Sequence, residues 1–296
     1  MVKDKNSVSH QDFYDLEDLQ LNIDPISNQR LTSWGNLGYW KQNRSDEITK
    51  LTYPKACEQL AIQLAQCATL DQLPDTHVVL DTGFGCGDQL AVWHAEYSVN
   101  CLYGINYSQS QTEFALHALN KAGIAGFTLK QGDCCEASSW HDIPKPIDRI
   151  IALDCVYHFQ NKPQYLNHCA KYLASDGVLA ISDLQLTKPL TNPLHKLMLR
   201  LICKLSHIPF SNLMTQEDAS ADLLIRGLKL DQVKDVTDAV FLPFGDWLSE
   251  HIKLVKNVGV TDQKLSWFKY ESTAKFLRWA YRHQILSYRL LQIRKA

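Results

Sequence analysis

The spacing of apolar residues changes repeatedly along the middle of the chain. Between residues 77 and 186, short apolar runs alternate with segments in which apolar side chains recur every three to four positions. This alternation is typical of βαβ units around a parallel sheet, because buried strands are short and continuous whereas helices bury one stripe. The runs predict strands at 77–81, 101–105, 126–131, 147–153 and 177–184. The periodic segments predict helices at 87–97, 108–122 and 163–174.

The segments on either side of this region have a different pattern. Residues 1–55 are polar apart from the aromatic cluster WGNLGYW at 34–40, and we expect an N-terminal helical cap there, on a domain that spans 56–296. After the fifth strand, an amphipathic segment interrupts the alternation and predicts a lid insertion at about 188–214. A helix at 215–227 and a strand at 228–236 follow, and residues 276–295 predict a last helix and strand.

Composition narrows the classes of protein further. The chain has 296 residues and a formal net charge of -2, so its charge does not favour binding to nucleic acid. Nine cysteines include no C-x-x-C pair, which argues against a disulfide framework and a structural zinc site, and we expect no metal. No run of eighteen apolar residues occurs, and we expect a cytoplasmic protein.

The stretch VVLDTGFGCGDQ, residues 78–89, places three glycines at alternate positions after the first strand. Asp81 ends the apolar run, and Gly83, Gly85 and Gly87 lead into the first helix. Such a turn presents bare backbone N–H groups at a helix N-terminus, where an anionic group binds. Enzymes that use dinucleotides and enzymes that use S-adenosylmethionine both have this turn. The position of Asp81, and the lack of an acidic residue at the end of the second strand, favour S-adenosylmethionine.

Four further stretches follow the later strands in order: LYGINYSQSQ, LKQGDCCE, IIALDCVYHF and YLASDGVLAISD. With the glycine turn they resemble class I S-adenosylmethionine-dependent methyltransferases over residues 30–296. The G-I-N-x-S-x-x-Q pattern and an early G-Y-W resemble the small-molecule branch, which includes tocopherol, sarcosine, phosphoethanolamine and sugar O-methyltransferases and cyclopropane fatty acid synthases. The resemblance implies a Rossmann-like α/β fold, with a seven-stranded, mostly parallel sheet and helices on both faces.

The same resemblance implies which residues bind the cofactor. The backbone around the three glycines would hold its methionine part, and Asp81 would orient that loop. Asn106 stands where most class I enzymes have a carboxylate that binds both ribose hydroxyls, and Ser108 and Gln111 begin the helix that follows.

The remaining cofactor residues come after the third and fourth strands and near the N-terminus. By the resemblance, Asp133 would accept a hydrogen bond from the adenine amino group, and the Cys134 backbone N–H would meet a ring nitrogen. Tyr39 would close over the methionine end. Asp154, which follows the fourth strand, completes the expected cofactor-binding set.

Methyl transfer requires an aligned nucleophile, exclusion of water and, for a hydroxyl acceptor, removal of a proton. His158 follows the fourth strand, and the ordinary pKa of histidine, about 6.5, suits this base. In sugar and phenol O-methyltransferases of this branch an Asp at the end of strand five supports the histidine, and Asp183 corresponds to it. Two alternatives stay open: a structural His158 packed between Tyr157 and Phe159, and Asp183 as a strand-end residue.

The amphipathic segment after the fifth strand allows two interpretations. Its basic residues recur every four positions, opposite an apolar stripe. We favour a lid helix that covers the substrate pocket with its apolar face and keeps its lysines in solvent. The alternative is docking on an anionic membrane surface or on a lipid-like acceptor. The basic residues are Lys196, Arg200 and Lys204, and the apolar ones are Leu194, Leu197, Leu201 and Leu205.

These features predict an enzyme that transfers a methyl group from S-adenosylmethionine to a small, partly apolar acceptor, with a hydroxyl oxygen as the favoured atom. Methylation at nitrogen or carbon, including cyclopropanation of lipid chains, is the first alternative. A non-catalytic protein that binds S-adenosylmethionine and a nicotinamide-dependent oxidoreductase are the others, and the second of these is opposed by Asp81 and Asn106.

Overall fold

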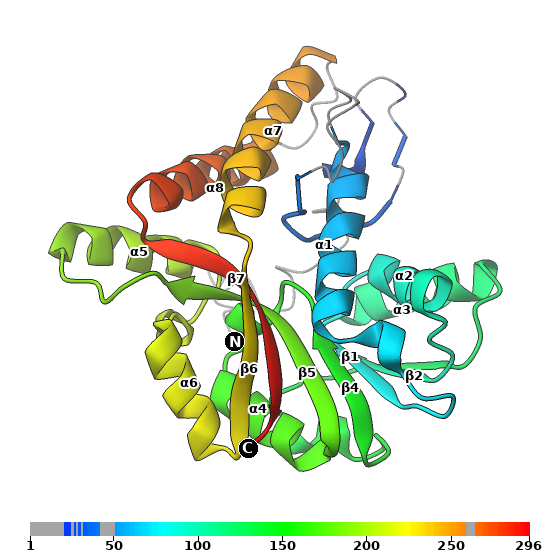
Figure 1. The fold of residues 1–296 in the computed structure, drawn as a ribbon. Helices are drawn as coiled ribbons and strands as arrows, with labels where there is room; N and C mark the ends of the chain where they lie inside the picture. The colour runs from blue at the N-terminus through cyan, green and yellow to red at the C-terminus, as the bar shows by residue number, and fades with distance from the viewer. Residues whose placement is uncertain (1–20, 25–26, 28, 31, 42–50, 259–263) are drawn as a thin grey trace, which may run out of the picture.

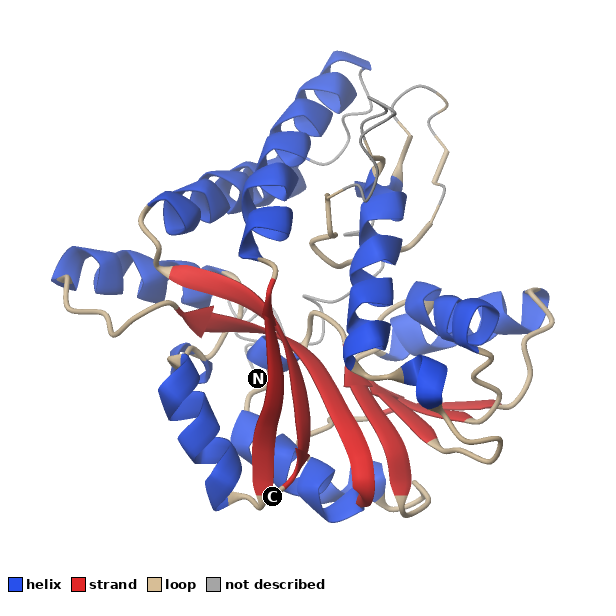
Figure 2. Cartoon of the chain, in the orientation of Figure 1, coloured by secondary structure: helices blue, strands red, loops and turns tan. Residues whose placement is uncertain are grey.

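The computed structural model describes residues 21–24, 27, 29–30, 32–41, 51–258 and 264–296. Most of the predicted N-terminal helical cap lies outside these ranges. Within them, a twisted sheet carries helices on both faces, and a pair of helices extends beyond one end of the sheet (Figures 1 and 2).

The sheet has seven strands in the order β3-β2-β1-β4-β5-β7-β6 within the described residues. The first five strands along the chain pair in parallel with one another, whereas β7 is antiparallel to both of its neighbours, β5 and β6. The predicted seven-stranded, mostly parallel α/β fold is therefore confirmed. The strands are β1 (Val79–Thr82), β2 (Leu102–Asn106), β3 (Phe127–Gln131), β4 (Ile147–Ala152), β5 (Leu173–Leu186), β6 (Leu228–Asp235) and β7 (Leu286–Lys295).

Local signals place the helices between these strands. Ser108 caps α3, because its Oγ accepts a hydrogen bond from the Gln111 N–H at 3.3 Å. The helices are α1 (Tyr53–Cys67), α2 (Asp88–Tyr97), α3 (Gln109–Lys121), α4 (Lys162–Tyr172), α5 (Pro193–Leu205), α6 (Gln216–Ile225), α7 (Thr237–Val258) and α8 (Lys264–Arg282). Short 3₁₀ helices are η3 (Leu70–Gln72), η4 (Ala137–Trp140), η5 (Val156–His158) and η6 (Phe210–Asn212).

Two hydrophobic cores lie on opposite faces of the sheet. Successive side chains of a strand point to opposite faces, and β5 shows this directly. Ala180 and Leu184 belong to the core that includes residues of α1, α2, α7 and α8. Leu179 and Ile181 belong to the core under α4. In this part of β5, even-numbered residues therefore face the first core and odd-numbered residues face the second.

The helices α7 and α8 between β6 and β7 pack against each other. The sequence predicted only the end of α8, and α7 was not predicted. Pro243 lies inside α7, where a proline normally signals a helix boundary. The Arg278 guanidinium joins the two helices by donating to the Gly245 carbonyl at 2.9 Å and to Asp246 Oδ1 at 2.8 Å.

The predicted insertion after β5 contains α5, but α5 packs on a different face from the one expected. Leu199 and Cys203 are buried against the body of the protein. The four leucines that were expected to cover a substrate pocket face solvent instead. The interpretation of this apolar stripe as the inner face of a lid is therefore wrong; the exposed residues are Leu194, Leu197, Leu201 and Leu205.

Candidate active site

Asp81 is fully buried at the end of β1 and holds the start of α2. The side-chain amide of Gln89 donates to its two oxygens at 3.1 and 3.2 Å, and Trp93 Nε1 donates to Oδ2 at 2.7 Å. Burial raises the pKa of Asp81 to about 6, while the Trp93 and Gln89 hydrogen bonds act in the opposite direction. Because both donors lie in α2, the carboxylate fixes the turn between β1 and α2.

The glycine turn makes close contacts at one glycine and leaves space at another. A Cβ atom at Gly83 would lie 2.7 Å from Cys155 Sγ, so the segment after β4 packs directly on the turn. A Cβ atom at Gly85 would have no neighbour within 4 Å. Gly85 also has a φ of 58°, in the left-handed region that favours glycine. The turn therefore leaves open space beside the backbone of Gly85, in front of the N-terminus of α2.

Asn106 connects this turn to the start of α3. Its Oδ1 accepts a hydrogen bond from the Gly85 N–H at 3.2 Å. Its Nδ2 donates to Gln111 Oε1 at 3.2 Å and to the Ser108 carbonyl at 3.3 Å. The structure thus brings together Gly85, Asn106, Ser108 and Gln111, four of the residues that the sequence assigned to the first two strand ends.

Asp133 and Cys134 lie at the same edge of the sheet. The Ile105 carbonyl in β2 accepts from the Gly83 N–H at 2.7 Å and from Cys134 Sγ at 3.7 Å. Asp133 Oδ1 accepts from the Cys135 N–H at 2.8 Å, and its side chain lines a surface depression with residues 130–132, 136 and 138–139. The predicted adenine-binding residues therefore lie next to the glycine turn.

Asp154 is the centre of a buried hydrogen-bond network. Its Oδ1 accepts from the hydroxyls of Tyr157 and Tyr288, each at 2.6 Å. Its Oδ2 accepts from the Leu37 N–H at 3.0 Å, and its own N–H donates to Ser182 Oγ at 2.6 Å. Burial raises the pKa of Asp154, which the three donors to its carboxylate partly oppose. The sequence placed Asp154 at the site, but the pattern gave no sign of its partners Tyr288 and Ser182.

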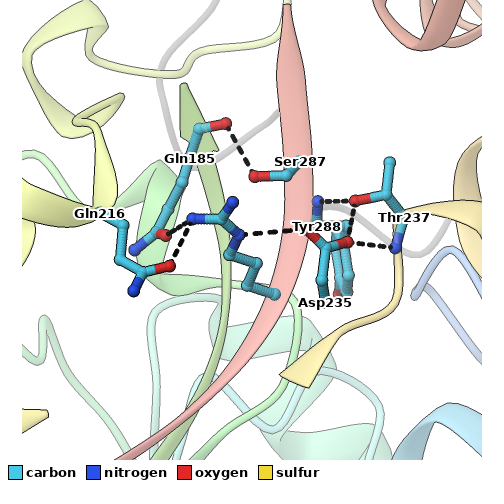
Figure 3. Close-up of polar contacts among 7 residues, drawn as sticks. Gln185, Gln216, Asp235, Thr237, Ser287 and Tyr288 are labelled. Atoms are coloured by element: carbon cyan, nitrogen blue, oxygen red, sulfur yellow. Dashed lines mark hydrogen bonds and ion pairs between the residues drawn. The ribbon is translucent and has the colours of Figure 1, made fainter. Parts of the chain in front are cut away.

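A network of polar side chains holds the backbone of Tyr288 in place (Figure 3). The Tyr288 N–H donates to Thr237 Oγ1 at 2.9 Å, and the Thr237 N–H donates to Asp235 Oδ1 at 3.0 Å. Arg289 donates to Asp235 Oδ2 at 3.2 Å and to Gln185 Oε1 at 3.0 Å. These contacts hold the start of α7 against β7 and so keep the Tyr288 hydroxyl directed at Asp154.

The aromatic segment at 33–40 crosses from the glycine turn to Asp154. At one end the Ser33 N–H donates to Asp88 Oδ1 at 3.2 Å, and Asp88 is the first residue of α2. Further along, Leu37 contacts Asp154 as described above. The Tyr39 N–H donates to the Ala56 carbonyl in α1 at 2.7 Å, and its ring is half-buried. The segment therefore runs from the turn after β1 to Asp154, which follows β4, while Tyr39 itself is attached to α1.

His158 and Asp183 do not form the expected pair. His158 ends η5, is half-buried, and lies 4.5 Å from the Tyr157 ring, centroid to centroid. Asp183 Oδ2 forms an ion pair with Lys162 Nζ at 2.5 Å, and Oδ1 has no hydrogen-bond partner among the described residues. Burial raises the pKa of Asp183, and Lys162 counteracts this. The pair does not form because successive side chains of β5 point to opposite faces of the sheet. Ser182 faces Asp154, so Asp183 points to the opposite face, where α4 begins.

In the part of the chain that the structure describes, His, Cys, Asp and Glu side chains form no group that could hold a metal ion. In the same ranges, no helix combines the length and the apolar composition needed to cross a membrane.

The sheet order, with a last strand antiparallel to its neighbours, is that of the Rossmann-like α/β fold that the sequence predicts. The sequence profile of the family described as mycolic acid cyclopropane synthetase matches residues 55–238, which is more than half of the chain. The chain belongs to this family. The site would fit the expected cofactor, S-adenosylmethionine, because the open space beside Gly85 faces a helix N-terminus and carboxyl ends of parallel strands.

Two curated relatives match parts of the chain. The methyltransferase GfsG of Streptomyces halstedii is 28% identical over 147 residues, which is 50% of this chain and 49% of GfsG. The (S)-coclaurine N-methyltransferase of Thalictrum flavum subsp. glaucum is 26% identical over 113 residues, 38% of this chain and 30% of that protein. The chain thus spans less than half the length of these curated relatives.

A solved structure matches the whole fold. The crystal structure of mycolic acid cyclopropane synthase CmaA1 complexed with SAH and CTAB has a TM-score of 0.74 to this chain, at 16% identity, and covers 96% of each chain. At this identity the likeness shows the fold alone.

Proposed function

We propose that the chain methylates a hydroxyl oxygen of a small, partly apolar acceptor, with His158 as the general base. Bound S-adenosylmethionine supplies an electrophilic methyl group. The tasks left to the chain are to orient the acceptor, to exclude water and to take up the hydroxyl proton at a ring nitrogen of His158.

One observation carries the assignment of His158. The Cβ position of Gly83 lies 2.7 Å from Cys155 Sγ and 4.0 Å from Phe159 Cε1. These two residues bracket His158 in the sequence, so η5 lies against the turn that binds the cofactor. A histidine at this place is close to the reacting end of the site, and its type suits proton removal near neutral pH.

The contacts around the glycine turn support the proposed cofactor roles. The Gly85 and Asn106 region would hold the methionine and ribose parts, and Asp133 with the Cys134 backbone would hold the adenine. Asp81 would act indirectly, because its carboxylate is used by Gln89 and Trp93. Asp154 would act in the same way through Leu37.

Aromatic side chains near the N-terminal segment support a partly apolar acceptor. The Trp40 ring lies 5.4 Å from the Trp247 ring, and Trp247 stacks on Tyr53 at 4.8 Å, centroid to centroid. Tyr39 and Phe159 are half-buried beside this group and beside the glycine turn, respectively. Half-buried rings of this kind suit an apolar ring or chain on the acceptor.

Nitrogen methylation is the second candidate, because one curated relative is an N-methyltransferase. A neutral amine needs no strong base, so this activity would tolerate the loss of His158. The two candidates therefore differ in their response to the same substitution.

The test measures S-adenosylhomocysteine formation with a panel of phenols, sugar-like alcohols and secondary amines across pH. With a hydroxyl acceptor, His158→Ala should lower kcat by about 10²–10⁴ and remove the rise of the rate with pH that a histidine base gives. Affinity for S-adenosylmethionine should not change. His141→Ala, an exposed histidine beside η4, is the matched control. Full activity of His158→Ala on hydroxyl acceptors would exclude its role as the base.

A further inference from the structure

The helix α5 has three distinct faces. Leu199 and Cys203 form the packed face, with exposed fractions of 0% and 3%. A second face is basic, and the third is an apolar stripe open to solvent. We call this third face the leucine stripe; it consists of Leu194 (61% exposed), Leu197 (66%), Leu201 (58%) and Leu205 (65%).

The basic face runs directly beside the leucine stripe. Lys196, Arg200 and Lys204 each precede a stripe leucine by one position, and all three are exposed. Since neighbouring residues of a helix lie about 100° apart, the two stripes run in parallel along the helix. The helix is therefore divided along its length between a hydrophobic and a cationic side.

The surrounding sequence adds positive charge and no negative charge. Residues 184–216 contain four Lys or Arg residues and no Asp or Glu, in a chain whose formal net charge is -2. The insertion therefore carries a net positive charge, although the chain as a whole is slightly negative. A partner with an apolar interior beneath an anionic surface complements both stripes.

The helix is formed and anchored without a partner. Asn192 Oδ1 caps it by accepting from the N–H groups of Leu194 at 2.9 Å and His195 at 3.2 Å. The His195 ring lies 5.4 Å from the Trp279 ring of α8, centroid to centroid. Binding through the leucine stripe would thus not require the helix to fold first, which lowers its entropic cost.

The size of the stripe argues against a stable dimer through this face. Four leucines at this exposure offer a few hundred Å² of apolar surface, whereas a stable protein interface buries about 800 Å² on each partner. A bilayer imposes no such requirement, because an amphipathic helix binds to it by shallow insertion of one apolar face and by attraction to anionic headgroups.

We propose that α5 binds the surface of an anionic phospholipid bilayer. The leucine stripe inserts below the headgroups, while Lys196, Arg200 and Lys204 contact the phosphates. The packed face, with Leu199 and Cys203, stays on the protein. This inference does not depend on which acceptor atom is methylated.

The test is sedimentation with two kinds of vesicle, phosphatidylcholine alone and phosphatidylcholine mixed with phosphatidylglycerol. The wild-type protein should bind the anionic vesicles at least tenfold more tightly than the neutral ones, and higher salt should weaken binding. Leu197→Ser with Leu201→Ser should reduce the partition coefficient at least tenfold. Lys196→Ala with Lys204→Ala should reduce it by about tenfold to thirtyfold.

Matched variants separate this effect from general changes of the surface. Leu224→Ser with Ile225→Ser removes exposed apolar residues of α6, and Lys121→Ala with Lys229→Ala removes exposed lysines elsewhere. Both should bind vesicles like the wild type. Unchanged thermal unfolding and S-adenosylmethionine affinity in the α5 variants would show that they are folded.

Three outcomes would overturn the proposal. The first is no binding of the wild type to anionic vesicles at low salt. The second is binding that the leucine variant does not reduce, which would leave only electrostatic attraction. The third is a concentration-dependent dimer, measured by ultracentrifugation, that the leucine variant abolishes in a protein that does not bind vesicles.

Discussion

The Asp154 carboxylate accepts a hydrogen bond at 3.0 Å from the backbone N–H of Leu37, 117 positions earlier in the chain. The same carboxylate holds the hydroxyls of Tyr157 and Tyr288. One buried side chain therefore connects the N-terminal aromatic segment to β4 and to β7. This contact helps to hold the segment over the site, together with the hydrogen bonds of Ser33 and Tyr39.

Replacement of Asp154 by Asn should release the segment. An amide that keeps its oxygen towards the tyrosines presents its N–H₂ group to the Leu37 N–H, so two donors face each other. We expect a loss of about 1–3 kcal/mol in the free energy of unfolding and faster amide exchange at residues 33–40. Hydrogen exchange and urea unfolding measure both. Asp238→Asn, which alters the exposed partner of Tyr281, should change neither, and equal effects of the two variants would contradict this account.

Two glycine substitutions should separate stability from cofactor binding. Gly83→Ala places a methyl group 2.7 Å from Cys155 Sγ, at a residue whose φ of 75° is also left-handed, and should destabilise the fold by about 2–5 kcal/mol from both effects. Gly85→Ala enters open space and should cost only about 1–2 kcal/mol for its left-handed backbone. Its methyl group would occupy space that we assign to the cofactor, so affinity should fall at least tenfold, which is about 1.4 kcal/mol. Thermal unfolding and calorimetric titration provide the two readouts. Unchanged affinity in Gly85→Ala would place the cofactor elsewhere.

The buried carboxylate of Asp81 should make stability depend on pH. Its pKa rises from 3.8 to about 6 on folding, so the folded state binds the proton more tightly than the unfolded state. The stabilisation from this proton is complete below pH 3.8 and is lost as the pH rises through about 6. It amounts to about 3 kcal/mol. Asp81→Asn stays neutral, so its stability relative to the wild type should rise across this range.

Urea unfolding of the wild type and Asp81→Asn between these pH values measures the difference. Asp75→Asn, at an exposed position, is the control and should follow the wild type. Parallel stability curves for the wild type and Asp81→Asn would show that burial does not raise the pKa of this carboxylate.

The buried pair of Lys162 and Asp183 should be sensitive to the loss of one partner. Lys162→Met leaves the Asp183 carboxylate without its only ion-pair partner in the described structure, and we expect a loss of about 3–5 kcal/mol. Adding Asp183→Asn should recover most of this loss. A double-mutant cycle by urea unfolding gives the coupling. If Asp183→Asn instead shifts the pH dependence of catalysis, Asp183 acts on His158 and the ion pair is secondary.

The parallel part of the sheet was predictable, because each strand there is a short apolar run followed by polar residues. The glycine turn and the Ser108 cap were predictable for a related reason: glycine permits left-handed backbone, and a serine hydroxyl can satisfy a free N–H group. These are local effects, and neighbouring residues in the sequence determine them. The site residues at the strand ends came together because parallel strands place their carboxyl ends at the same edge.

Contacts between distant segments were not predictable. Nothing near Asp183 in the sequence indicates Lys162, since the choice between His158 and Lys162 depends on which face of β5 the side chain occupies. The helix α5 posed a similar problem, because apolar residues on two faces compete for the packed position, and the buried pair Leu199 and Cys203 is less conspicuous than the leucine stripe. Pro243 obscured α7.

The position of β7 has a consequence for synthesis of the chain on the ribosome. β7 lies between β5 and β6 and pairs with both. Until residues 286–295 have left the exit tunnel, β5 presents an unpaired edge and β6 has no strand to join. Exposed strand edges invite association with other chains. The nascent protein therefore carries this risk from the time β5 leaves the tunnel until β7 has emerged and paired with it.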